Sequence, residues 1–178
     1  LHEYENNMVV YLNEPGSLFR KSHVLQTEEG PVALKLVDLN FDGRVDSIVT
    51  NSKSISLFIF LQNEKSEFSL NHSLQTGSNP VRTAITDANM DGSLDIAVVH
   101  QTIGFVFLFH GKKGGSFLPP LRIQVPRHSA DLVFTRYNDD PFPDLLVLNY
   151  KANKIIALVS EPQENSFREV DSFATGDG

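Results

Sequence analysis

"DLNFDGRVD" at residues 38–46 places three aspartates, one asparagine and one glycine in nine positions. "DANMDGSLD" at residues 87–95 repeats this polar pattern 49 positions later. A single loop of such composition is typical of a polar turn. Its return at a fixed spacing predicts instead that the chain is built from repeated units.

The 49-residue spacing extends well beyond the two acidic loops. "GPVALKLVD" from Gly30 aligns with "NPVRTAITD" from Asn79 and "HSADLVFTR" from His128, and the loops are followed in register by "DSIVTN", "DIAVVH" and "DLLVLN". A third, apolar segment recurs at 7–12, 56–61, 105–110 and 154–159. A fourth segment opens in each unit with a phenylalanine: Phe19, Phe68, Phe117 and Phe167. Each complete unit therefore contains four short segments.

The chemistry of these segments indicates strands. In the first segment Val32, Leu34 and Leu36 alternate with their neighbours, which is the period of a strand with one face turned inward. The second and third segments are continuous runs of Ile, Val, Leu and Phe, as expected where both faces of a strand are covered. In the fourth segment, Pro119 and Pro120 cannot donate to a ladder and so indicate an edge strand.

Four antiparallel strands in each repeat of about 49 residues predict an all-β fold of β-propeller blades. Residues 1–29 are expected to form the last two strands of a preceding blade, and complete blades are expected at 30–78, 79–127 and 128–178. Propellers close with about four to eight blades, so these cannot close a ring alone. We expect either a longer parent chain or another copy to supply strands or blades.

Composition excludes several classes of partner and site. The net charge of −7 and the pI near 5.3 argue against binding to nucleic acid or to an anionic membrane surface. No apolar run in this segment reaches the roughly 18 residues of a membrane span. The sequence has no cysteine, which rules out disulfides and thiolate metal sites and leaves the compartment unassigned.

The two acidic loops have the chemistry of a calcium site. A hard divalent cation prefers six to eight oxygen ligands, and alternating positions of a tight loop can supply them. Each loop offers four oxygen-bearing side chains and one backbone carbonyl. The sequence therefore predicts two Ca²⁺ sites. The ligands expected in the first loop are Asp38, Asn40, Asp42, the Arg44 carbonyl and Asp46. Those expected in the second are Asp87, Asn89, Asp91, the Ser93 carbonyl and Asp95.

Two other interpretations of the loops can be weighed from the sequence. An EF-hand requires a glutamate at position 12, where this chain has Val49 and Val98. A cation-free turn held by Asp and Asn side chains stays open as an alternative. The third loop, "RYNDDPFPD" at 136–144, has Arg136 in place of the first aspartate and Pro141 in place of the glycine. We predict that it binds no ion and that Arg136 pairs instead with Asp140 or Asp144.

Units with an inward first strand, a D-x-[DN]-x-D-G-x-x-D loop and a second strand of one aspartate and four apolar residues resemble the FG-GAP/VCBS repeats of integrin-α-like propellers. The resemblance implies calcium binding in the loop between the first two strands and a ring that commonly has seven blades. It also implies secretion to an extracellular or cell-surface location. "NPVRT" stands where the "GAP" word would be, so the chain is closer to the VCBS variant and integrin-type ligand binding is not implied.

The sequence shows no catalytic constellation. The six histidines form no H-x-x-x-H or H-E-x-x-H motif, so a zinc site is not expected. Ser129 lies beside His128 and near Asp131, but neighbours in a strand point to opposite faces, which argues against a triad. The sequon "NHS" falls on a predicted outer strand and makes Asn71 a candidate glycosylation site on secretion from a eukaryotic cell.

These observations predict a non-catalytic, calcium-binding, extracellular β-propeller module that binds protein or carbohydrate in adhesion. The alternative is a structural subunit of an extracellular fibre or array, in which further copies of the chain complement one another's strands or blades. A third possibility is a propeller that is appended to an enzyme or is itself hydrolytic, for which this segment lacks a convergent polar site.

Overall fold

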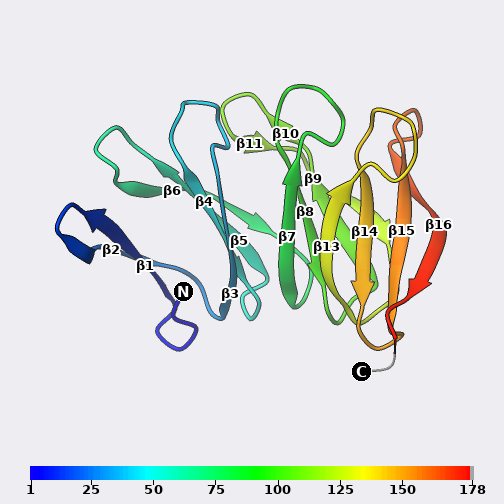
Figure 1. Ribbon diagram of the computed structural model, residues 1–178, viewed down its shortest axis with the longest axis horizontal. Helices are drawn as coiled ribbons and strands as arrows, with labels where there is room; N and C mark the ends of the chain where they lie inside the picture. The colour runs from blue at the N-terminus through cyan, green and yellow to red at the C-terminus, as the bar shows by residue number, and fades with distance from the viewer. Residues whose placement is uncertain (177–178) are drawn as a thin grey trace. The chain divides into compact units, whose positions relative to one another are not determined.

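The computed structural model describes residues 1–176, which contain strands and turns and no helix. The chain divides into two compact units, Leu1–Gln75 and Thr76–Gly178, which are described separately. Each complete sheet has four antiparallel strands in sequence order along the sheet, except for a short extra hairpin in the second unit (Figure 1). The predicted all-β fold of four-stranded units is therefore confirmed.

The first unit holds one hairpin and one sheet. The hairpin consists of β1 (Asn7–Glu14) and β2 (Ser17–Gln26). The sheet consists of β3 (Pro31–Val37), β4 (Asp46–Asn51), β5 (Ser56–Gln62) and β6 (Phe68–Gln75). Met8 of β1 packs with Val49 and Phe60 in a buried cluster, so one side of the hairpin covers part of the sheet.

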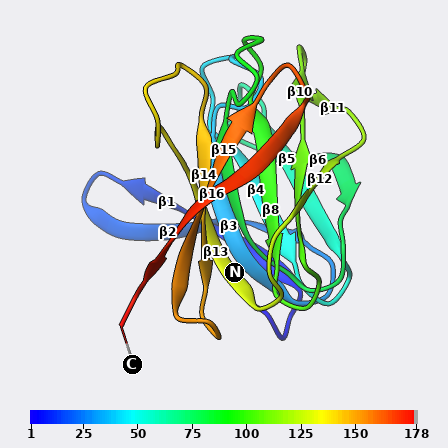
Figure 2. The same cartoon turned by 90° about the vertical axis from the view of Figure 1, so that its right-hand side faces the viewer.

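The second unit holds two complete sheets, seen from the side in Figure 2. The first sheet consists of β7 (Pro80–Thr86), β8 (Asp95–His100), β9 (Phe105–Phe109) and β12 (Leu121–Gln124). The second consists of β13 (Ser129–Thr135), β14 (Asp144–Asn149), β15 (Lys154–Glu161) and β16 (Ser166–Ala174). A short hairpin of β10 (Gly111–Lys112) and β11 (Ser116–Phe117) extends from the first sheet.

The two sheets of the second unit pack face to face and enclose its core. β13 lies against β7 and β8, as the green and yellow strands of Figure 1 show. Ala97 and Val99 of β8 and Leu145 and Val147 of β14 are buried in one cluster. One set of alternate residues in each of these apolar strands therefore faces the other sheet of the unit.

The expected inward face of the first strand is only partly correct. Leu132 of β13 is buried, whereas Leu34 and Leu36 of β3 are exposed. The physical reason is the small size of the hairpin β1–β2. Its apolar cluster with the sheet involves residues of β4, β5 and β6 and includes none from β3. The side of β3 that carries Leu34 and Leu36 is left open to solvent.

The edge position of the fourth strand is confirmed, and the prolines change its course. β12 pairs only with β9, at the end of its sheet. Pro119 and Pro120 lie outside any strand and separate β11 from β12. In the other units the fourth segment is one strand of eight to ten residues. The two missing N–H donors thus divide this segment where the others remain continuous.

Candidate metal centre

The two acidic loops occupy the same place in successive sheets. Residues 38–46 connect β3 to β4, and residues 87–95 connect β7 to β8. Both loops contain one non-glycine residue and one glycine with positive φ: Phe41 at 60° and Gly43 at 84°, Met90 at 60° and Gly92 at 84°. A left-handed backbone favours glycine, which explains the D-G step in both sequences. The loops therefore share one backbone conformation.

The first aspartate of each loop organises the backbone of the turn. Asp38 accepts the N–H of Asp42 at 3.0 Å and of Gly43 at 2.8 Å. Asp87 accepts the corresponding N–H groups of Asp91 and Gly92 at 3.0 and 2.8 Å. These bonds orient both oxygens of the first carboxylate toward the turn.

The asparagine and the middle aspartate lie next to each other in both loops. Asn40 donates its amide N–H to Oδ2 of Asp42 at 3.0 Å, and Asn89 does the same to Asp91 at 2.9 Å. Burial opposes ionisation of Asp42, but the bonds from Asn40 and from the N–H and guanidinium of Arg44 outweigh it and lower its pKa. The pKa of Asp91 is lowered in the same way, with the bond from Asn89 as the main favourable contribution against burial.

The last aspartate of each loop is fully buried and has a structural role that sequence reasoning missed. Asp46 accepts the N–H of Leu39 at 3.0 Å and of Gln62 at 2.9 Å. Asp95 accepts the N–H of Ala88 at 2.9 Å and of Gly111 at 2.8 Å. The carboxylate thus ties the start of the second strand to the loop and to the end of the third strand. The signal available in the sequence was the aspartate kept at this position in all three loops.

The two loops differ in the basic side chain beside them. In the first loop, Nη2 of Arg44 lies 2.8 Å from Oδ2 of Asp42, and its Nε donates to the carbonyl of Gln62. In the second loop Ser93 stands at that position, and Nδ1 of His110 lies 3.2 Å from Oδ2 of Asp95. Contact with the Asp95 carboxylate raises the pKa of His110, although burial of the ring opposes the shift. Each loop therefore has a different basic side chain beside it.

The predicted ligands of the two acidic loops fit a hard cation in type, but their side chains do not yet converge on a single metal position. The four predicted ligand side chains of each loop, three aspartates and one asparagine, all offer oxygen atoms, which suits calcium chemistry. Within residues 1–176, no group of three or more His, Cys, Asp or Glu side chains is arranged to hold a metal ion. Asp38, Asn40 and Asp42 are brought together by their hydrogen bonds, while Asp46 is buried against the strands.

The third loop has lost the shared turn and does not form the predicted ion pair. None of residues 136–144, all of which the structure describes, has a positive φ. Asp144 accepts the N–H of Tyr137 at 2.8 Å and of Ser160 at 2.9 Å, and Asp140 accepts the Asn138 amide at 2.6 Å. The expected pair of Arg136 with Asp140 or Asp144 was wrong, because backbone and amide donors already serve both carboxylates.

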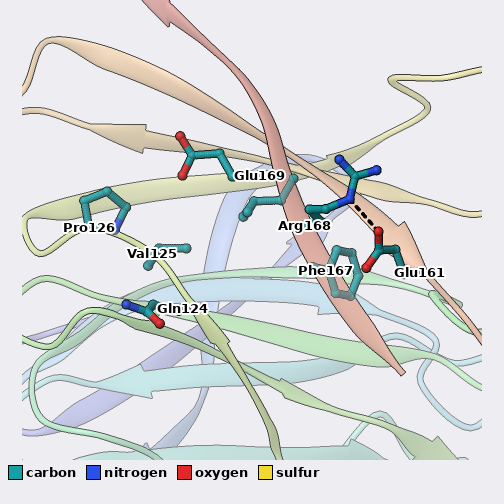
Figure 3. Close-up of a pocket in the computed structure, with 8 residues that line it drawn as sticks. Gln124, Val125, Pro126, Glu161, Phe167, Arg168 and Glu169 are labelled. Atoms are coloured by element: carbon teal, nitrogen blue, oxygen red, sulfur yellow. Dashed lines mark hydrogen bonds and ion pairs between the residues drawn. The ribbon is translucent and has the colours of Figure 1, made fainter. Parts of the chain in front are cut away.

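The second unit also has an open polar cleft at the outer edge of its two sheets (Figure 3). Gln124 and Pro126 line one side, and Phe167 and Glu169 line the other. Nε of Arg168 lies 2.6 Å from Oε1 of Glu161, and this bond lowers the pKa of the glutamate. The pair is internally neutral, so Glu169 gives the cleft its uncompensated charge.

Residues 38–98, which contain both acidic loops, match the model of the FG-GAP-like repeat. The resemblance stated from the sequence is confirmed for these residues. FG-GAP repeats are generally non-enzymatic and typically occur in extracellular proteins. None of the curated proteins matches the chain.

Solved structures match the chain over most of its length. The crystal structure of a protein from Lactobacillus plantarum matches with a TM-score of 0.76 and 12% identity, covering 97% of this chain and 51% of that one. A Photorhabdus luminescens Tc holotoxin pore matches with a TM-score of 0.50 and 16% identity, covering 97% of this chain and 9% of that one. At these identities the likeness shows the fold alone. The chain spans about half the length of the first protein and less than a tenth of the second.

Within the described residues, no helix is long and apolar enough to cross a membrane.

Proposed function

We propose that this chain is a non-catalytic β-propeller module that binds calcium in two loops and binds protein or carbohydrate outside the cell. The observation that carries the calcium proposal is the duplicated geometry of residues 38–46 and 87–95. The same left-handed positions and the same hydrogen bonds recur in both loops. Two independent copies of one oxygen-rich turn are better explained by a shared ligand than by chance.

Calcium would be held by the oxygens of Asp38, Asn40, Asp42 and Asp46 in the first loop. In the second loop the corresponding residues are Asp87, Asn89, Asp91 and Asp95. The carbonyls of Arg44 and Ser93 complete the two sets. Each carboxylate oxygen that accepts one N–H keeps a further lone pair for a cation. A divalent ion would also offset the repulsion among three carboxylates in one loop.

Thermal melting with calcium and with a chelator tests this proposal. A ligand that binds only the folded state raises its stability by mass action, so Tm should rise with calcium concentration. Asp42→Ala and Asp91→Ala should each reduce this rise by removing one site. Asp140→Ala is the matched control, because Asp140 holds the same position in the third loop. Equal melting with calcium and with chelator would remove the metal from the proposal.

For the ligand, we place protein or carbohydrate binding in the polar cleft of Figure 3. Its side chains combine an amide, carboxylates and a phenyl ring, which are groups that hydrogen-bond and stack on sugars and peptides. Probing immobilised glycans and peptides with the wild-type chain and with Gln124→Ala and Glu169→Ala tests the assignment. Binding that both variants retain in full places the ligand elsewhere.

A second candidate function is assembly of copies into an extracellular fibre or array. The specific observation is the hairpin β1–β2. Within the described residues, β1 pairs with β2 on one side, and on its other side only Asn7 is bridged, to His2. In the four-stranded sheets the equivalent strands β5, β9 and β15 each pair on both sides. An unpaired strand edge offers backbone donors and acceptors to a neighbouring chain.

Glycosylation of Asn71 is proposed on the same extracellular premise. Asn71 lies on β6, the outer strand of its sheet, and is exposed. A glycan there would extend into solvent. Expression in a eukaryotic secretory host, followed by glycosidase treatment and mass measurement, tests the site, with Ser73→Ala as the variant that removes the sequon.

A further inference from the structure

One face of the first sheet in the second unit is covered by the second sheet. We call this the forward face, because it points toward the next repeat along the chain. Its residues come from all four strands and from the loop after β7, and all are buried in one cluster: Ala84, Ala88, Ala97, Val99, Val106, Leu108 and Ile123. The forward face of one repeat is thus built to receive the sheet of the next.

The forward face of the second sheet is apolar as well, yet it is open. The positions equivalent to those above hold Val133, Tyr137, Leu146, Leu148, Ile155, Ala157 and Phe173. Ile123 is 3% exposed where its equivalent Phe173 is 43% exposed. Ala84 is 9% exposed where its equivalent Val133 is 53% exposed. Six of these seven residues are larger than their equivalents, and the exception is Ala157, which is fully buried and stands where the first sheet has Leu108. A solvent-facing surface does not require such large apolar side chains.

A shallow apolar pocket marks the centre of this open forward face. Its volume is about 200 Å³, and five apolar residues and one carboxylate line it: Leu132, Val133, Leu146, Leu148, Ile155 and Asp131. Leu146 and Leu148 are half-buried, whereas Ala97 and Val99 at the equivalent places of β8 are completely covered. The surface therefore has the shape and composition of a blade interface that lacks its second half.

The hairpin β1–β2 carries an open face of the complementary kind. Met8 and Val10 pack against the sheet of the first unit, so Val9 and Tyr11 lie on the other side of β1. Val24 pairs with Val9 and shares that side. Tyr11 is 55% exposed and Val24 is 45% exposed. We call this side the backward face.

The last complete repeat shows what the backward face of a sheet contacts. Three repeats after Val9 and Tyr11 stand Ile156 and Leu158 of β15. Both are buried in the cluster that covers the forward face of the preceding sheet. The backward face of the hairpin is therefore equivalent to the surface that already fits a forward face in the second unit.

Charge favours the same pairing. Lys21 is the partner of Tyr11 across the hairpin and so lies on the backward face. Asp171 is the partner of Ala157 across β15 and β16 and so lies on the forward face. In the interface between the two sheets of the second unit, the position equivalent to Lys21 is Glu169 of β16, and the position equivalent to Asp171 is Leu121 of β12. Strands β16 and β12 contact each other. One positive and one negative side chain would therefore meet between two molecules.

We propose that the forward face of β13–β16 in one molecule docks onto the backward face of β1–β2 in a second copy. The contact is head-to-tail: it joins two unlike surfaces, so it can repeat from copy to copy into a ring or a filament. This inference rests on the second candidate function, assembly of copies. It is independent of calcium binding, because no predicted calcium ligand lies on either face.

Sedimentation velocity of the chain from micromolar to millimolar concentration tests the proposal. The wild type should associate as concentration rises. Leu148→Asp blocks the forward face, Tyr11→Asp blocks the backward face, and each variant alone should sediment as a monomer. Mixed in equal amounts, the two variants should form a dimer and nothing larger, because one intact face of each kind remains. Leu118→Asp, at an exposed apolar site outside both faces, is the control.

The outcomes separate the possible failures. Val133→Asp replaces Leu148→Asp if the latter fails to fold, since Val133 is more exposed. A wild type that stays monomeric at every concentration overturns both the docking proposal and the assembly function. Association that neither blocking variant reduces keeps assembly but overturns the two faces. Repeating the sedimentation runs with calcium and with a chelator shows whether association depends on calcium binding.

Discussion

The carboxylate of Asp144 accepts the backbone N–H of Ser160 at 2.9 Å, although its loop has lost both the first aspartate and the glycine. Asp46 and Asp95 make the equivalent bonds to Gln62 and Gly111. All three carboxylates are completely buried. The last aspartate of each repeat therefore stabilises the blade in its own right, whether or not the loop binds an ion.

Asp144→Asn should destabilise the fold. An amide can accept at one atom only, and its NH₂ group would face a buried N–H that now bonds to carboxylate oxygen. The expected loss is about 1–3 kcal/mol in the free energy of unfolding. Urea denaturation in the presence of a chelator measures it. Asp139→Asn in the same loop is the control, and an equal loss in both variants would contradict the structural role of Asp144.

Arg44→Ala should raise the calcium affinity of the first loop. The guanidinium lies 2.8 Å from Asp42 and competes with a cation for the same carboxylate. An exposed ion pair is weak because solvent screens it, so only a modest increase in affinity is expected. Calorimetric titration with calcium measures it. Ser93→Ala, at the same place in the second loop, keeps the backbone carbonyl and removes a neutral hydroxyl that bonds to Asp91 rather than a positive charge. It should therefore not raise the affinity of the second loop. A weaker first site in Arg44→Ala would show that the guanidinium supports binding.

Gly92→Ala should destabilise the second loop. Its φ of 84° is unfavourable for a residue with a Cβ, although nothing lies within 4 Å of the place a Cβ would occupy. The cost is conformational and about 1 kcal/mol. Gly92→Asn should cost less, because asparagine tolerates the left-handed region. Thermal melting of both variants checks the order, and equal melting temperatures would indicate that another backbone conformation is accessible.

His100 should make the fold sensitive to acid. Burial lowers its pKa to about 4, and its Nε2 accepts the N–H of Gly77 at 3.0 Å, which requires the neutral ring. The unfolded chain has the ordinary pKa near 6.5, so it binds the proton first as pH falls. Full stability is present above about pH 6.5 and decreases down to about pH 4, by about 3 kcal/mol in total.

His100→Asn tests this pH dependence with a residue the fold already uses, since Asn51 and Asn149 stand at the equivalent positions. Urea denaturation between pH 7 and pH 4 should show a smaller loss of stability in the variant than in the wild type. If the free energy of unfolding falls equally with pH in both proteins, groups other than His100 cause the acid sensitivity.

Prediction from the sequence worked where the repeat itself carried the information. The strands β4, β8 and β14 each start at the aspartate that closes a loop, as the aligned "DSIVTN", "DIAVVH" and "DLLVLN" indicated. Prediction from the sequence was less reliable for the burial of side chains that a neighbouring sheet must cover. Leu36 and Phe134 are equivalent in the repeat, but Phe134 packs against a core cluster while Leu36 is exposed.

The sequence alone determined the all-β blade repeat, the place of the two acidic loops and the divergence of the third, because each follows from residue type and spacing. The tertiary structure decided which partner each polar group takes. It placed Asp144 on backbone N–H groups rather than on Arg136, and it left Phe173 exposed where Ile123 is buried. The physical reason is that hydrogen-bond geometry and burial depend on neighbouring strands and sheets, which a repeat pattern within one chain does not record.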